Sequence, residues 1–257
     1  MKSPLRKRLP RELKSEFGKY LVVFIIMAIT IGFVSGFLVA DGSMLRAYDD
    51  SFQKYNIEDG YFQTKKKLTP AQKEDIEKSD VKVYENFYIE QKLTNGSTIR
   101  FFKNRKEVDK VCLMKGKMPK KSGEIAVDRM YADNNELKVG DTVKSRKKTF
   151  RITGLVALSD YSALFQNNND TMFDAVKFGV AIVTDKDFEA LNQVKVQYNY
   201  AWIYDKKPAT EKKEKKMAED LMEDMADVVT IESFVPQYQN QSIHFTGDDM
   251  GSDRAMI

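Results

Sequence analysis

One stretch of the sequence constrains the fold more than any other. Residues 20–40 read YLVVFIIMAITIGFVSGFLVA and contain no charged side chain and no Asn, Gln or His. A helix of this length spans about 30 Å, the thickness of the hydrocarbon core of a bilayer. Because an unpaired backbone amide is costly in lipid, a lone apolar stretch crosses a membrane only as a helix. We therefore predict a transmembrane helix over residues 20–40, since the rest of the chain is not apolar enough to bury it.

The charges on the two sides of this stretch predict its orientation. Lys and Arg outnumber Glu before it, whereas Asp41, Asp49 and Asp50 follow it. Basic residues stay on the cytoplasmic side of a membrane, so we expect an inside N-terminus and an outside domain. The alternative is a cleaved signal peptide, but its apolar core is normally about 7–15 residues long. An uncleaved anchor is the favoured interpretation.

Small residues repeat every four positions along the predicted span. They are Ala28, Gly32, Gly36 and Ala40. Small residues on one stripe allow a second helix to approach closely, which predicts a helix-packing face. The alternative is that Gly and Ala are simply common in membrane helices.

The flanking segments divide the chain further. Residues 1–19 place Leu and Phe every fourth position among basic residues, which predicts an amphipathic leader on the membrane surface; a plain basic leader is the alternative. Residues 41–58 are interpreted as an outward stalk helix whose apolar face carries Met44, Tyr48, Phe52 and Tyr55. Residues 59–253 form the expected extracytoplasmic domain, and residues 254–257 are interpreted as the start of a second membrane helix.

Strands and helices are mixed along residues 59–253, which predicts an α+β domain. Thr69, Pro70 and Gln72 have the pattern of a helix start, and Asn95-Gly96 that of a two-residue hairpin turn. The expected strands cover 61–63, 81–93, 97–103, 124–127, 149–158, 179–184, 198–204 and 229–234. The expected helices cover 68–79, 128–134, 185–191 and 210–228, and the expected polar loops cover 159–174 and 237–253.

The sequence offers no catalytic, cofactor or metal site. Cys112 and His244 are the only residues of their types, so neither an internal disulfide nor a Cys/His metal site is expected. No phosphate-binding loop or hydrolase motif is present. The run Asn167–Asp170 could attract a cation, but loop Asn and Asp more often form turns. The net charge of +4 is concentrated in the leader, which indicates membrane topology rather than nucleic-acid binding.

Several segments resemble the FtsX-like, or MacB-type, permeases of ABC transporters. The residues Phe17-Gly18-Lys19-Tyr20-Leu21 resemble the start of the first membrane helix in that family. Gly116 and Pro119, followed by Gly123–Val127 and Leu137–Val143, resemble the core of its external domain, and Phe150–Val156 resembles the next strand. The resemblance covers nearly the whole chain.

The resemblance implies an α/β core of the MacB periplasmic type with a second inserted subdomain. It also implies a cytoplasmic ABC ATPase subunit, a second permease copy or homologous permease, and at least three further membrane helices. The substrate would be a lipid or peptide, and the source bacterial. Because the chain stops where a second membrane helix is expected, we interpret it as a fragment of a permease or a truncated one.

Two other functions fit the sequence less well. A single-pass anchored binding or sensor module would need an output, which a cytoplasmic leader of residues 1–19 is too short to provide. An anchored exoenzyme has no supporting group of residues.

Overall fold

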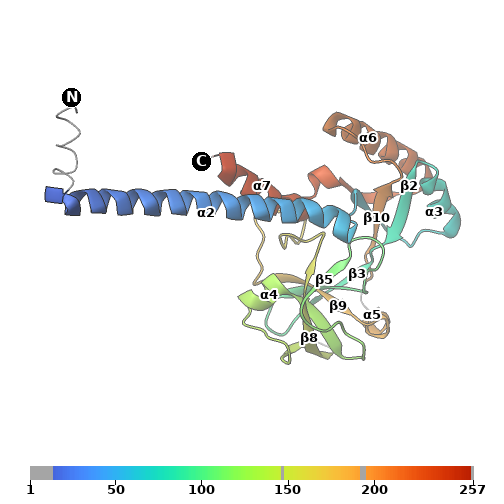
Figure 1. Ribbon diagram of the computed structural model, residues 1–257. Coiled ribbons are helices and arrows are strands. Elements are labelled where there is room, and N and C mark those ends of the chain that lie inside the picture. The colour runs from blue at the N-terminus through green and yellow to red at the C-terminus, as the bar shows by residue number, and fades with distance from the viewer. Residues whose placement is uncertain (1–13, 146–147, 192–194, 256–257) are drawn as a thin grey trace. The chain divides into compact units, whose positions relative to one another are not determined.

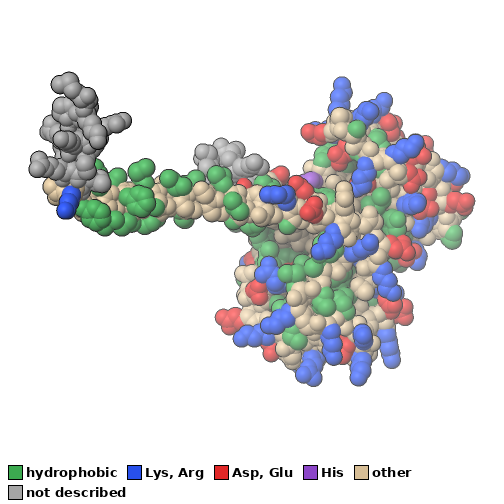
Figure 2. All heavy atoms as spheres, viewed as in Figure 1, with side chains coloured by type: hydrophobic (Ala, Val, Ile, Leu, Met, Phe, Trp, Pro, Cys, Tyr) green, Lys and Arg blue, Asp and Glu red, His purple; other side chains and the backbone are tan. Residues whose placement is uncertain are grey.

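The apolar stretch and the segment after it form one helix, α2 (Phe17–Tyr55). The structure, a computed structural model, describes residues 14–145, 148–191 and 195–255 (Figure 1). The large apolar side chains of residues 20–39 are exposed, as Figure 2 shows along the helix. This is the one helix of the described chain that is long and apolar enough to cross a membrane.

The chain divides into two units. One consists of the described part of residues 1–48 and 250–257, and the other of Asp49–Asp249. The expected leader falls mostly on residues 1–13, which lie outside the described residues, as do 256–257 of the expected second membrane helix. The two sheets, their buried clusters and the cavities all belong to the unit Asp49–Asp249.

A four-stranded antiparallel sheet has the strand order β11-β1-β10-β2. Its strands are β1 (Gly60–Thr64), β2 (Val81–Glu85), β10 (Tyr198–Tyr204) and β11 (Ile231–Pro236). Alternation along the strands puts Phe62, Tyr200 and Trp202 on one face, where they form a buried cluster with Leu221 and Met225. This face is covered by α3 (Pro70–Glu77) and α6 (Glu211–Val228), which lie beside it in Figure 1.

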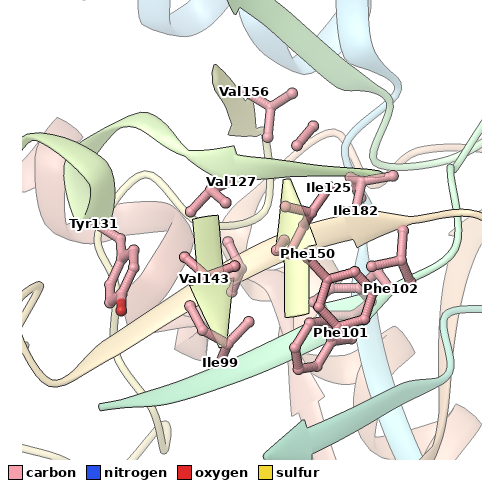
Figure 3. Close-up of a cluster of buried hydrophobic side chains, with 14 of the residues drawn as sticks. Ile99, Phe101, Phe102, Ile125, Val127, Tyr131, Val143, Phe150, Val156 and Ile182 are labelled. Atoms are coloured by element: carbon pink, nitrogen blue, oxygen red, sulfur yellow. The ribbon is translucent and has the colours of Figure 1, made fainter. Parts of the chain in front are cut away.

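A larger, seven-stranded mixed sheet has the order β3-β4-β9-β6-β8-β5, with β7 paired to β8. Its strands are β3 (Tyr88–Lys92), β4 (Thr98–Phe102), β5 (Val111–Gly116), β6 (Glu124–Asp128), β7 (Thr142–Lys144), β8 (Thr149–Leu158) and β9 (Phe178–Val183). Two short helices accompany it, α4 (Arg129–Asn134) and α5 (Asp185–Leu191). Figure 3 shows its core, in which the rings of Phe101 and Phe150 lie 5.6 Å apart.

The predicted helix starts are confirmed where side chains cap them. Thr69 and Gln72 form a complete capping box with Pro70 in the first turn of α3. Asp128 caps α4 and Thr210 caps α6, so these two helices begin where the sequence predicts. The expected α+β fold class, with a long apolar helix before the sheets, is confirmed.

Residues 81–93 do not form the single strand that their alternation predicts. The structure has β2 in the small sheet and β3 in the large one, with the chain crossing between the sheets at Asn86 and Phe87. The crossing occurs because the Asn86 amide donates to the buried Asp109 carboxylate at 2.7 Å, a partner that no local pattern reveals. A second crossing lies beside it, since Asn86 N donates to Asn199 O at 2.9 Å.

Three further local predictions are wrong. The expected polar loop 237–253 contains a short 3-10 helix, η1 (Gln237–Gln239), and α7 (Gln241–Ala255). The buried Ile243 and the bond from Ser242 N to Asn240 Oδ1 fix the start of α7, whereas its glycines suggested a loop. Strand β5 was not predicted. The β3–β4 turn has three residues, Thr94–Gly96, because Leu93 N bonds to Ser97 O and Gly96 has a φ of 89°.

Gly116 ends β5 in a backbone conformation that favours glycine. Its φ is +77°, and a Cβ atom there would lie 2.3 Å from the carbonyl oxygen of Thr153. Gly123 has a similar φ of +87°, but a Cβ atom there would meet nothing within 4 Å. A side chain at Gly123 would therefore cause backbone strain alone, whereas a side chain at Gly116 would cause backbone strain and a steric clash with β8.

We predict that Gly116→Ala destabilises the protein clearly more than Gly123→Ala. The matched Gly123→Ala variant carries only the left-handed strain, about 1–2 kcal/mol, while Gly116→Ala must also displace the β8 backbone. Denaturant unfolding of both variants measures the difference. Equal losses of stability would contradict the close approach of β5 and β8.

Candidate functional site

Helix α2 ends in a cap that turns the chain sharply into the domain. Asn56 adopts a φ of 51°, and Ile57 N donates to Phe52 O at 3.0 Å, the long bond of a Schellman-type C-cap. Asn is one of the residues that tolerate this left-handed conformation. Its side-chain amide also donates to Glu107 O at 2.8 Å, so the helix end is fixed to the segment before β5.

The residues after this cap contact both sheets. Asp59 N donates to Trp202 O at 2.9 Å, and the Asp59 carboxylate accepts from Tyr204 N at 2.9 Å, which joins the turn to β10. Glu58 N donates to the Asp109 carboxylate at 2.9 Å, which joins it to the segment before β5. We call the buried polar group around this turn the junction cluster; its members are Glu58, Asn86, Arg105, Asp109, Asp160 and Asn240.

The junction cluster contains more acidic than basic side chains. Arg105 donates two bonds of 2.7 Å to the carboxylate of Asp160, and its guanidinium lies 3.9 Å from Asp109. The Glu58 carboxyl group accepts a 3.3 Å bond from the Asn240 amide. One guanidinium thus faces three carboxyl groups in a buried environment, where unpaired charge is costly.

This imbalance shifts proton binding in the junction cluster. Burial, and then the neighbouring Asp160 carboxylate, raise the pKa of Asp109 to about 7, against the lowering effect of Arg105. Burial, and then the carboxylates of Asp109 and Asp160, raise the pKa of Glu58 well above its ordinary range. Around neutral pH the cluster therefore holds protons that the unfolded chain would release.

We predict that stability falls as the pH rises from 5 to 8. A carboxyl group with a raised folded-state pKa stabilises the fold fully below its ordinary pKa, and this contribution is lost as the pH rises through the folded-state value. The melting temperature of the full chain, measured across this range, should therefore decrease. The Asp109→Asn variant should show a shallower decrease, because an amide cannot ionise.

The exposed residue Asp220 on α6 provides the matched control. The Asp220→Asn variant should keep the wild-type slope of melting temperature against pH. If Asp109→Asn and Asp220→Asn give the same slope as wild type, Asp109 does not titrate in this range.

We also predict that Arg105→Leu costs about 3–5 kcal/mol, because it leaves Asp160 buried without its cation. Arg129 is a matched control, since it also pairs with an Asp, at 3.2 Å, but both partners are more than half exposed. Arg129→Leu should change stability little. Denaturant unfolding gives the free energy of unfolding of both variants. Similar losses of stability would show that the buried pair stabilises the fold no more than the exposed pair does.

A cavity of about 750 Å³ lies beside the crossing at Asn86. Its charged lining is largely paired, with Lys67 and Glu85 at 2.8 Å and Lys103 and Glu189 at 3.4 Å. A second cavity, of about 370 Å³, is lined by the junction residues Glu58, Asp160 and Asn240 and by residues 166–169. We call this smaller one the polar cavity.

The small-residue stripe lies on the exposed part of α2. Ala28, Gly32, Gly36 and Ala40 are all exposed, and a Cβ atom at either glycine would meet nothing within 4 Å in the described chain. Among the described residues, therefore, nothing packs against the two glycines of the stripe. Its role in helix association stays a prediction.

The stalk residues are not all equivalent. Met44 is exposed, whereas Tyr48, Phe52 and Tyr55 are half-buried. Phe52 lies 6.5 Å from the ring of His244, and Tyr55 O accepts from Lys110 N at 2.9 Å. The last turns of α2 are thus packed into the unit Asp49–Asp249.

Part of the loop 159–174 lines the polar cavity, namely Asp160, Tyr161 and residues 165–169. Within the loop, Asn167 N donates to the Asp170 carboxylate at 2.9 Å. A bond between a carboxylate and a nearby backbone amide is typical of a turn. Among the described residues, no group of three or more His, Cys, Asp or Glu side chains could hold a metal ion.

Sequence reasoning missed the junction cluster. Its members come from five separate segments, and a single charged residue next to a turn normally faces water. The signal that was present is Asp59-Gly60, which predicts a helix end at residue 58, whereas the helix ends at Tyr55 and Asn56 turns the chain. This signal does not indicate that Glu58 and Asp59 are buried.

Two solved structures resemble this chain. The periplasmic region of MacB from Actinobacillus actinomycetemcomitans has 13% identity and a TM-score of 0.35, over 68% of this chain and 87% of that one. The extracellular domain of the noncanonic ABC-type transporter YknZ from Gram-positive bacteria has 12% identity and a TM-score of 0.34, over 68% of this chain and 97% of that one. No family model and no curated protein matches the sequence.

Proposed function

We propose that this chain is part of a membrane permease of the FtsX-like, MacB-type ABC transporters. In this proposal α2 crosses the bilayer with its N-terminus inside, and residues 59–253 lie outside. A cytoplasmic ABC ATPase subunit drives the complex, and the substrate is a lipid or peptide. The chain itself supplies no catalytic group in this proposal.

The observation that carries the proposal is the continuity of α2. A single helix, Phe17–Tyr55, contains both the apolar segment and the last turns that pack into the domain. A helix is stiff because every interior amide is bonded within it. Movement of its membrane part would therefore be transmitted to the junction cluster rather than absorbed in a flexible linker.

The family-like segments support the same proposal. Gly116 approaches the β8 backbone closely, residues 123–127 include most of β6, and residues 150–156 form most of β8. β6 and β8 are parallel neighbours at the centre of the large sheet, and β5 pairs with β8. The segments that resemble the family are thus adjacent in space as well as ordered in sequence.

The small-residue stripe has a role in this proposal. Ala28, Gly32, Gly36 and Ala40 form the face on which another membrane helix packs, from a second permease copy or from a homologous permease. Met44, Tyr48, Phe52 and Tyr55 then continue the helix as the transmission face. Both assignments are parts of the proposal.

The test uses the complete membrane protein that contains this chain, purified in lipid nanodiscs with the subunits that accompany it. We predict that the complex hydrolyses ATP and transports substrate, and that Phe52→Ala lowers transport at least severalfold without lowering expression. The expected cause is loss of the Phe52 contact with His244 at the helix end. Lys54→Ala, at an exposed position two residues on, is the control and should transport normally.

Two outcomes count against the proposal. A complex that contains no ATPase and hydrolyses no ATP would rule out the transporter role. Normal transport by Phe52→Ala would leave the transporter role in place but remove the transmission role of the stalk.

The second candidate is a membrane-anchored binding or sensor module outside the cell. The polar cavity favours it, because a binding module needs a preformed site of this size. Absence of any ATPase from the purified complex would favour this candidate.

A further inference from the structure

The polar cavity lies against the face of the small sheet opposite α3 and α6. Strand alternation places Tyr61, Gln63, Asn199 and Ser233 on this face, opposite the buried aromatic cluster. Gln63 is directly opposite Asn199 on one side and Ser233 on the other, so the three form a polar row across β10, β1 and β11. A sheet face that only contacted a core would carry apolar residues at these positions.

The opposite wall comes from the large sheet and its loop. Tyr88 and Arg100 belong to β3 and β4, and Gln63 Nε2 bridges the two walls by donating to the Tyr88 hydroxyl at 3.1 Å. Residues 166–169 and Gln239 close the remaining sides with amide groups. The volume of about 370 Å³ is within the range of small-molecule sites, about 300–1,000 Å³.

The charged side chains in the cavity wall have partners within the protein. Arg100 donates to Glu90 at 2.6 Å and to the Tyr161 hydroxyl, and Asp160 is held by Arg105. Burial raises the pKa of Glu58 well above its ordinary range. Although the chain is rich in lysine, no Lys is among the described residues that line the cavity. A ligand with a formal charge would therefore find no free partner.

One polar atom in the cavity wall is unsatisfied. The Asn199 side chain is nine-tenths buried, and its amide oxygen has no hydrogen-bond partner among the described residues. A buried polar atom without a partner is costly, and native proteins leave few of them unless a ligand or water completes the site. Asn199 lies at one end of the polar row described above.

The groups available are amides, hydroxyls and aromatic rings. Amides and hydroxyls both donate and accept hydrogen bonds, which suits the hydroxyl groups of a sugar. Tyr61 and Tyr161 also line the cavity and are only half-buried, so their rings offer surface for the C–H faces of a sugar ring. β1, β10 and β4 are interior strands whose backbones are already paired, so these three strands offer side chains rather than a free edge to a peptide.

We propose that the polar cavity is a binding site for a neutral, hydroxyl-rich ligand, a short saccharide. Gln63, Asn199 and Ser233 bond its hydroxyl groups, and the aromatic rings contact its faces. The proposal goes beyond the transporter role and does not depend on it, since the site is complete whether or not an ATPase is present.

Isothermal titration of the full chain in lipid nanodiscs tests this. The probes are the disaccharides maltose, cellobiose and di-N-acetylchitobiose, with dialanine blocked at both ends, and so uncharged, as the peptide for comparison. We expect at least one disaccharide to bind saturably in the millimolar range or tighter. Gln63→Ala and Asn199→Leu should each weaken it about tenfold, the effect of one lost hydrogen bond in a buried site.

Gln91→Ala is the matched control, because Gln91 is also a half-buried strand residue but does not line the cavity. It should bind the disaccharide as the wild type does. Gln63→Ala keeps the test decisive if Asn199→Leu fails to fold. No binding of any disaccharide, binding of dialanine alone, or disaccharide binding unchanged by Gln63→Ala would each overturn the proposal, and none of these outcomes bears on ATP hydrolysis by the complex.

Discussion

The buried carboxyl group of Asp109 holds together segments that are far apart in the sequence. It accepts hydrogen bonds from Glu58 N, just after the long helix, and from the Asn86 amide, where the chain crosses between the sheets. Its own segment also receives the helix end, through the bond from Asp109 N to Asn56 O at 3.0 Å. Because buried donors need acceptors, the helix end, the crossing and the approach to β5 are fixed by one side chain.

The junction cluster and the polar cavity share three residues, Glu58, Asp160 and Asn240. These three side chains therefore belong to the cluster around the turn after α2 and also line the space where we place a ligand. A ligand that contacted them would act on the helix through one layer of hydrogen bonds. Such coupling requires that the ligand binds two arrangements of the junction with different affinity. Burial raises the pKa of Glu58, and it raises the pKa of Asp109 to about 7, so the proton occupancy of this layer depends on its surroundings.

The sequence predicts the parts of this fold that depend on local chemistry. Thr69, Asp128 and Thr210 cap helices where expected, and the apolar period of α6 is strong enough to define it alone. The division of residues 81–93 between two sheets could not be predicted, because both halves alternate correctly and the break depends on a bond from Asn86 to a distant Asp109. The junction cluster was missed for the same reason: burial of Glu58 depends on tertiary packing, which a single sequence does not encode locally.

The two crossings between the sheets lie side by side, with Asn86 bonded to Asn199 and Tyr88 bonded to Gln197. All seven strands of the large sheet come from the chain between these points, while β2 and β10 remain paired neighbours. In this topology, residues 88–197 form an insertion between two neighbouring strands of the small sheet. The insertion could be lengthened or replaced without changing the order of the strands that follow the helix. Because only one wall of the polar cavity belongs to the insertion, such a change would alter the cavity and leave the attachment of the helix as it is.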